Sequence, residues 1–191
     1  MSPGDCSDVD KKTMSRRKLT PTNAGVHDMS DATTAALSPH TGNRFQFDTT
    51  SVEWHKFFTP GTWYRILSVD VVARQADMLV KFDPNSQCMY HRHAACTSTL
   101  VLEGELRVRE QVNGTEIVKI KPAGNYSIGG EGEIHIEGSG QEQAVIFFGM
   151  RSETDVIYEL LDEKLNLKRA VTVEDFDRDW RAHWPNDPRK N

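Results

Sequence analysis

The chain has 191 residues, a formal net charge of −5, and a composition that is 37% hydrophobic and 8% aromatic. This length is sufficient for one domain with a sizeable core. The acidic balance excludes a general attraction to nucleic acid or to anionic membranes. No stretch approaches the roughly 20 apolar residues that span a bilayer. We therefore expect a globular protein with neither a nucleic-acid nor a membrane partner.

Residues 1–45 are rich in Ser, Thr, Asp, Pro and Gly and show no apolar periodicity. Such a composition predicts a disordered N-terminal extension, followed by one folded domain over residues 46–191. The first residues lack the apolar segment of a secretory signal. Three cysteines, an odd number, do not form a disulfide framework. We expect a cytoplasmic protein with free thiols.

Short apolar runs bounded by turn residues predict a series of strands. They lie at 63–67, 69–72, 76–82, 98–102, 105–110, 115–120 and 144–150. Glu103-Gly104 and Asn113-Gly114 separate neighbouring runs, and Asn-Gly favours the positive φ angles of a type I′ hairpin turn. A third turn is expected at residues 129–132. Many short strands without intervening helices predict a sandwich or a closed barrel.

One helix is expected near the end of the chain. Thr172 can cap a helix that begins at Val173. Four residues with an apolar or aromatic character then share one stripe: Phe176, Trp180, His183 and Trp184. We expect this stripe to pack against the outside of the barrel or across a dimer seam.

The histidines of the middle of the chain indicate a metal site. His91 and His93 are two residues apart, so on an extended strand both side chains point to the same face. Imidazole is a common metal ligand at neutral pH. His135, which follows the third turn, would complete a facial set of three nitrogens and leave other positions open. Such a geometry is typical of a catalytic rather than a structural metal.

Residues 60–160 resemble the cupins. His91-Arg92-His93 and the hairpin around Gly104 are similar to the first cupin motif. The segment 130–135 is similar to the second motif, although its usual proline is replaced. The resemblance implies an all-β fold, a single cupin (jelly-roll) β-barrel with a short C-terminal helix. Because cupins of this size commonly dimerise, it also implies a homodimer.

The glutamate ligand that usually belongs to the first motif is replaced by Thr97. Among cupins the chain therefore resembles the ChrR-like group that includes acetylacetone dioxygenase and 2,4′-dihydroxyacetophenone dioxygenase, whose members hold iron with three histidines. This implies Fe(II) at His91, His93 and His135, with a small-molecule ketone and O2 as substrates. Three neutral ligands leave the ion its full charge, which favours an anionic chelating substrate. The implied reaction cleaves a C–C bond of a β-diketone or an aryl hydroxyketone.

Glu110 is the candidate catalytic carboxylate. It shares strand parity with Leu106 and Val108, so it faces the interior if they do. The other interpretation is a solvated carboxylate at the hairpin mouth. Glu133 shares parity with His135, so one interpretation places it beside the metal ligands; we favour the other, a turn carboxylate. The candidates for hydrogen bonds to the histidine ligands are Gln87, Tyr90, Thr97 and Thr99.

Two other functions are compatible with a three-histidine cupin. One is a non-catalytic zinc-binding or sensor cupin, similar to the zinc-binding cupin of anti-sigma factors, although nothing in this sequence resembles the helical sigma-binding domain of such a protein. The other is an isomerase or lyase that depends on zinc or manganese, which usually has the glutamate that Thr97 replaces. A 2-oxoglutarate-dependent enzyme is disfavoured, because such enzymes have an HxD motif.

Overall fold

The computed structural model describes residues 48–184. The predicted N-terminal extension at residues 1–45 lies outside this part of the chain. The described elements are the 3-10 helix η1 (Thr49–Ser51) and the strands and helix that follow: β1 (His55–Lys56), β2 (Thr62–Asp70), β3 (Gln75–Phe82), β4 (His91–His93), β5 (Cys96–Glu103), β6 (Glu105–Val112), β7 (Thr115–Pro122), β8 (Tyr126–Gly129), β9 (Ile134–Gly138), β10 (Ala144–Arg151), β11 (Val156–Leu161), β12 (Leu167–Thr172) and α1 (Val173–His183).

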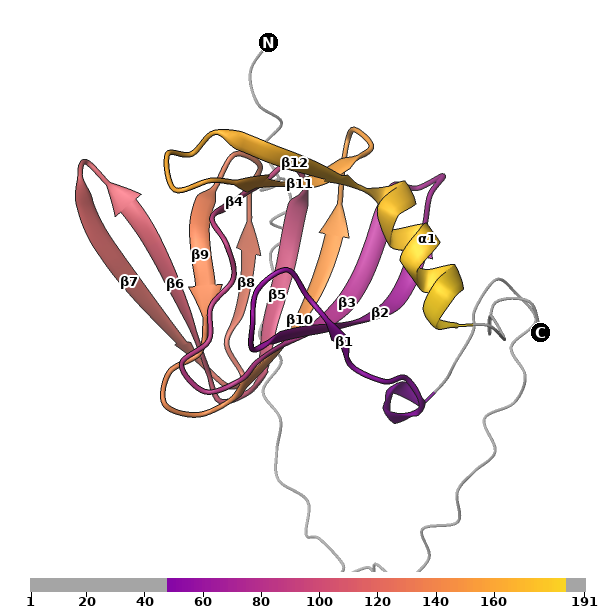
Figure 1. Cartoon of the computed structure of the whole chain (residues 1–191), viewed down its shortest axis with the longest axis horizontal. Coiled ribbons are helices and arrows are strands. Elements are labelled where there is room, and N and C mark those ends of the chain that lie inside the picture. Colours follow the sequence, from indigo (N-terminus) through magenta and orange to yellow (C-terminus); the bar gives the residue numbers. More distant parts are fainter. Residues whose placement is uncertain (1–47, 185–191) are drawn as a thin grey trace, which may run out of the picture.

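The strands form two antiparallel sheets that face each other (Figure 1). One sheet has the order β1-β2-β3-β10-β5-β8, and the other has the order β12-β11-β4-β9-β6-β7. In Figure 1 the β6–β7 hairpin lies at one end of the molecule and α1 at the other. The arrangement is a two-sheet jelly roll, which confirms the predicted all-β class.

The core lies between the two sheets because their strands alternate between buried and exposed residues. In β3 the buried positions are Ala76, Met78, Val80 and Phe82, every second residue. This alternation is expected of strands that bury one face and leave the other in solvent. Side chains from the opposite sheet, such as Leu106 of β6, complete the same core.

Two predicted hairpin turns are confirmed by their backbone angles. Asn113 and Gly114 have φ angles of 52° and 78°, as a type I′ turn requires. Gly104 has a φ of 65°, and a Cβ atom there would collide with the carbonyl oxygen of Gln143. Glycine is therefore needed at the β5–β6 turn for both its conformation and its size.

Two parts of the strand prediction were wrong. The runs at 63–67 and 69–72 form the single strand β2, which ends at Asp70. The chain then turns, and Val72 is 95% exposed. The apolar pair Val71-Val72 resembles part of a strand in sequence but lies in this turn. Strands β8 and β11 were not predicted, and the edge strand β12 was missed because Lys168 and Arg169 interrupt its apolar pattern.

Helix α1 packs on the outside of the barrel, against β2, β3 and β12. Its first turn has the predicted cap: Thr172 Oγ1 accepts from the Asp175 N–H, and the Asp175 carboxylate accepts from the Thr172 N–H. Phe176 and Trp180 are buried, and Trp184 Nε1 donates to the carbonyl of Ile66. The dimer seam stays a prediction.

Within residues 48–184, no helix combines the length and the apolar character that a membrane span requires.

We predict that Trp180→Ala destabilises the protein by about 3–5 kcal/mol, because it removes a completely buried aromatic side chain and leaves a cavity. Denaturant unfolding followed by circular dichroism measures this loss. Arg181→Ala is the matched control on the next residue, where an exposed side chain pairs with Asp177, and it should change stability by less than about 1 kcal/mol. Equal effects of the two substitutions would contradict the packing of α1.

Candidate metal centre

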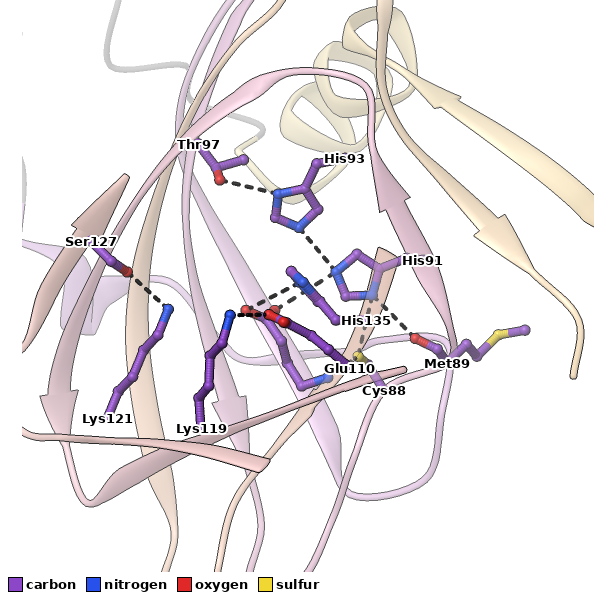
Figure 2. Close-up of polar contacts among 11 residues, drawn as sticks. Cys88, Met89, His91, His93, Thr97, Glu110, Lys119, Lys121, Ser127 and His135 are labelled. Carbon is purple, nitrogen blue, oxygen red and sulfur yellow. Dashed lines mark hydrogen bonds and ion pairs between the residues drawn. The ribbon is translucent and has the colours of Figure 1, made fainter. Parts of the chain in front are cut away.

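The three predicted histidines are brought together by strands β4 and β9, which are neighbours in one sheet. His91 lies directly opposite His135 in the antiparallel register, and His93 follows two residues later on the same face of β4. Two backbone hydrogen bonds hold the turn before β9 against β4: Gly132 N–H donates to the His93 carbonyl, and His93 N–H donates to the Glu133 carbonyl. Figure 2 shows the three rings pointing toward one another.

The cluster is tight and almost inaccessible to water. His91, His93 and His135 are 8%, 5% and 4% exposed. Their ligand nitrogens all lie within 4.8 Å of one another, and His91 Nε2 is 3.1 Å from His93 Nε2. Within residues 48–184, this is the only such group of His, Cys, Asp or Glu side chains. The set has the residue types and the separations that a single divalent ion requires.

Hydrogen bonds orient two of the three rings. His91 Nδ1 lies 3.1 Å from the carbonyl oxygen of Met89 (Figure 2). A carbonyl oxygen only accepts, so this Nδ1 carries the proton and His91 Nε2 carries a lone pair. His93 Nδ1 lies 3.1 Å from Thr97 Oγ1, a hydroxyl that can accept or donate; when Nδ1 donates to it, Nε2 is the ligand atom. Of the four predicted partners, Thr97 therefore contacts a histidine ligand.

All three rings are neutral at pH 7, because burial disfavours their charged form. Burial lowers the pKa of His91 to about 4, that of His93 to about 3 and that of His135 to about 2. Neutral imidazole is the form that binds metals. In the described part of the chain, both ring nitrogens of the buried His135 lack a hydrogen-bond partner. Since buried polar atoms are normally satisfied, this ring fits a site that holds a cation.

Glu137 is a fourth buried polar side chain beside the histidines, and the sequence reasoning missed it. It follows His135 by two residues on β9, and it is the only buried acidic residue among those described. Its two carboxylate oxygens lie 3.8 Å from His91 Nε2 and 3.7 Å from His135 Nε2. Burial raises the pKa of Glu137 to about 7. The strand parity with His135 was a signal that could have identified it.

The predicted catalytic residue Glu110 lies on β6, at the hairpin that β6 forms with β7. Its carboxylate is 2.7 Å from Lys119 Nζ, and 21% of its side chain is exposed (Figure 2). Lys121, on the same strand as Lys119, donates to Ser127 Oγ. Glu110 is not among the side chains that line the cavity beside the histidines. Its catalytic role stays a prediction.

A cavity between the two sheets adjoins the histidine cluster. His91, His93, Thr97 and Glu137 form its polar side. Most of its other walls are apolar or aromatic side chains, among them Phe57, Phe58, Val80, Phe82, Phe148 and Tyr158. Phe58 is 42% exposed, so it lies where this cavity meets solvent. The cavity has a volume of about 50 Å³ and is polar beside the histidines and apolar on its other walls.

We predict that Thr97→Val weakens metal binding about 10–100-fold, because His93 loses the hydroxyl that orients its ring. Thr97→Ser keeps the hydroxyl and should bind as the wild type does. Competition between the protein and a chelator for Co²⁺ measures both affinities. Wild-type affinity in Thr97→Val would show that this hydrogen bond does not orient the ligand.

We also predict that His135→Ala abolishes metal retention, since it removes one of three ligands. Metal analysis after dialysis checks the loss, and circular dichroism checks that the fold persists. His183→Ala is the control, because His183 stacks on His55 outside the cluster and should leave the metal content unchanged. Full metal content in folded His135→Ala protein would contradict the site.

Comparison with known proteins agrees with this fold. The ChrR cupin-like domain family matches residues 42–153. No curated protein matches the chain. An RmlC-like cupin from Ralstonia eutropha JMP134 superposes with a TM-score of 0.60 at 15% identity, and the match covers 72% of this chain and 85% of that one.

Two further solved structures carry the same fold. A proposed acetylacetone dioxygenase from Methylibium petroleiphilum PM1 has a TM-score of 0.57 at 14% identity, covering 72% of this chain and 94% of that one. The acetylacetone dioxygenase from Acinetobacter johnsonii has a TM-score of 0.53 at 12% identity, covering 89% and 99%. At these identities the structures establish the fold alone. Because the family match spans more than half of the chain, the protein belongs to the ChrR cupin-like domain family.

Proposed function

We propose that the protein is a non-haem Fe(II) dioxygenase that cleaves a C–C bond of a β-diketone or an aryl hydroxyketone. The observation that carries the proposal is the cluster of three buried, neutral histidines, with Thr97 where the first cupin motif usually has a glutamate. The fold shared with acetylacetone dioxygenases is consistent with it. His91, His93 and His135 would hold the iron.

The cavity favours a substrate with an apolar body. Aromatic side chains such as Phe82, Phe148 and Tyr158 can contact a hydrocarbon or aryl group, while the oxygens of the substrate face the histidines. Exclusion of water by these walls also strengthens electrostatic interactions at the polar side. A strongly hydrophilic sugar or dicarboxylate would lose its hydration there without enough replacement hydrogen bonds.

Positive charge on β7 favours an anionic form of the substrate. Lys119 and Lys121 both act electrostatically on His135, where they contribute to its lowered pKa. The same field stabilises an enolate relative to the neutral ketone. Since Lys119 is paired with the Glu110 carboxylate, it is Lys121 that supports a substrate that loses a proton before or as it binds.

In the proposed reaction both atoms of O2 enter the products. For a β-diketone, the bond between the central carbon and one carbonyl carbon breaks. One fragment leaves as a carboxylic acid and the other as a 1,2-dicarbonyl compound. Bound iron supplies Lewis acidity toward the ketone oxygens and a path for electrons between substrate and O2. The chain orients the substrate in its apolar cavity, and Glu110 remains the proposed catalytic carboxylate.

We also propose a homodimer in the cytoplasm, as the resemblance to small cupins implies. Light scattering on the purified protein should give twice the chain mass of 21.6 kDa. A mass equal to one chain would contradict the dimer.

Protein purified without oxygen is expected to hold stoichiometric iron. An oxygen electrode should then record O2 uptake equal to the substrate consumed when pentane-2,4-dione or an aryl hydroxyketone is added. His135→Ala should show neither. Tightly held zinc with no O2 uptake would contradict the proposal and favour the zinc-binding sensor. Turnover without O2 would favour the isomerase or lyase.

A further inference from the structure

We propose that Glu137 is a fourth protein ligand of the metal, delivered by β9 in place of the glutamate that Thr97 replaces on β5. The inference rests on the metal-binding part of the proposed function and not on the identity of the substrate. It makes the site a set of three histidines and one carboxylate. In the first cupin motif the carboxylate would come from position 97 on β5, whereas here it comes from β9.

The distances suit a shared ion. Two donors that bind one ion at about 2.1 Å lie roughly 3 to 4 Å apart, with the shorter value for adjacent donors and the longer for opposite ones. The Glu137 oxygens are 3.8 Å from His91 Nε2 and 3.7 Å from His135 Nε2. Each separation lies in this range, but each involves a different oxygen, and no single Glu137 oxygen joins the group of histidine nitrogens that lie within 4.8 Å of one another, so binding one ion requires the carboxylate to turn toward His93.

The chemistry of the facing atoms calls for a cation between them. His91 Nε2 presents a lone pair, because Nδ1 of this ring donates to Met89. His93 Nε2 lies only 3.1 Å away, and the Glu137 carboxylate offers further lone pairs to the same space. Acceptors that converge in a buried site repel one another unless a positive charge separates them. A metal ion held by the three histidines, with the Glu137 carboxylate turned toward it, removes this repulsion.

The backbone fixes Glu137 in place before any ion arrives. Its N–H donates to Cys88 Sγ at 3.2 Å, and its carbonyl accepts from the Cys88 N–H at 2.8 Å. The next residue, Gly138, packs so closely on the segment before β4 that a Cβ atom there would collide with the Ser86 carbonyl. The contacts of Glu137 with Cys88 and the close packing of Gly138 therefore both hold β9 against this segment. A ligand on a rigid element needs little reorganisation to bind.

Thr97 has a different task in this arrangement. Its hydroxyl lies 3.1 Å from His93 Nδ1, so it orients a ligand instead of being one. Position 97 thus holds the orienting group, and position 137 holds the carboxylate donor. With Glu137 bound, a ferrous site has a net charge of +1, which a single enolate neutralises.

The test compares Glu137→Gln and Glu137→Ala with Glu133→Gln in binding Co²⁺ to metal-free protein. Glu133 is the matched control, since it is also two residues from His135 but is exposed. Changes beside a ligand typically cost about 10–100-fold in affinity, so loss of a ligand should cost more than about 100-fold in both Glu137 variants. The visible absorption of bound Co²⁺ should also change, because it reports coordination number and geometry.

Wild-type affinity and spectrum in the Glu137 variants would overturn the inference. So would weaker binding with an unchanged spectrum, which would make Glu137 an orienting residue. Circular dichroism separates these results from a failure to fold. The readout needs no turnover: a chain that binds Co²⁺ through Glu137 but consumes no O2 with any ketone would refute the proposed dioxygenase and leave the ligand assignment intact.

Discussion

The structure depends on the burial of four polar side chains on the inner face of two short paired strands. His91 and His93 of β4 and His135 and Glu137 of β9 are each at most 8% exposed. An unsatisfied buried polar group costs about 1–3 kcal/mol, and more when it is charged. Among these four side chains, His135 is the one whose two ring nitrogens lack a hydrogen-bond partner, so its burial is unfavourable unless something binds to it. Before anything binds, the surrounding apolar core must stabilise the pairing of these two strands.

The two sheets contribute different kinds of side chain to the site. The sheet that contains β4 and β9 supplies the three histidines and Glu137. The facing sheet supplies much of the apolar wall, through residues such as Val80 and Phe82 of β3 and Phe148 of β10. A molecule between them meets a polar surface on one side and an apolar one on the other. This asymmetry orients an amphipathic ligand without a dedicated hydrogen bond for each of its atoms.

Local patterns predicted most of this fold. Asn113-Gly114 identified its turn, because few other dipeptides adopt two positive φ angles in succession. The pairing of His91 with His135 across β4 and β9 came from the cupin resemblance, since no local signal indicates which distant strands become neighbours. The edge strand β12 was missed because it carries solvent-exposed charges on a short segment.

The candidate site was predictable only in part, for physical reasons. The spacing of His91 and His93 places both on one face of any strand. The acceptor for His91 is the backbone carbonyl of Met89. Every residue has such a carbonyl, so the sequence does not indicate which one accepts. Glu137 did have the right parity, but carboxylates are usually exposed, so only its burial distinguishes it from Glu133.

The alternation of side chains along β9 limits the insertions and deletions that the turn before it can accept. His135 and Glu137 point inward, while Ile134 and Ile136, which alternate with them, are less buried. Because strand side chains alternate, a one-residue insertion or deletion in the glycine-rich turn before β9 would exchange the two pairs if the strand slipped with it. Two isoleucines would then fill the interior, and a stable sheet could form with no ligands at all. The length of that turn is therefore constrained by the register of His135 and Glu137, whichever side chains the turn carries.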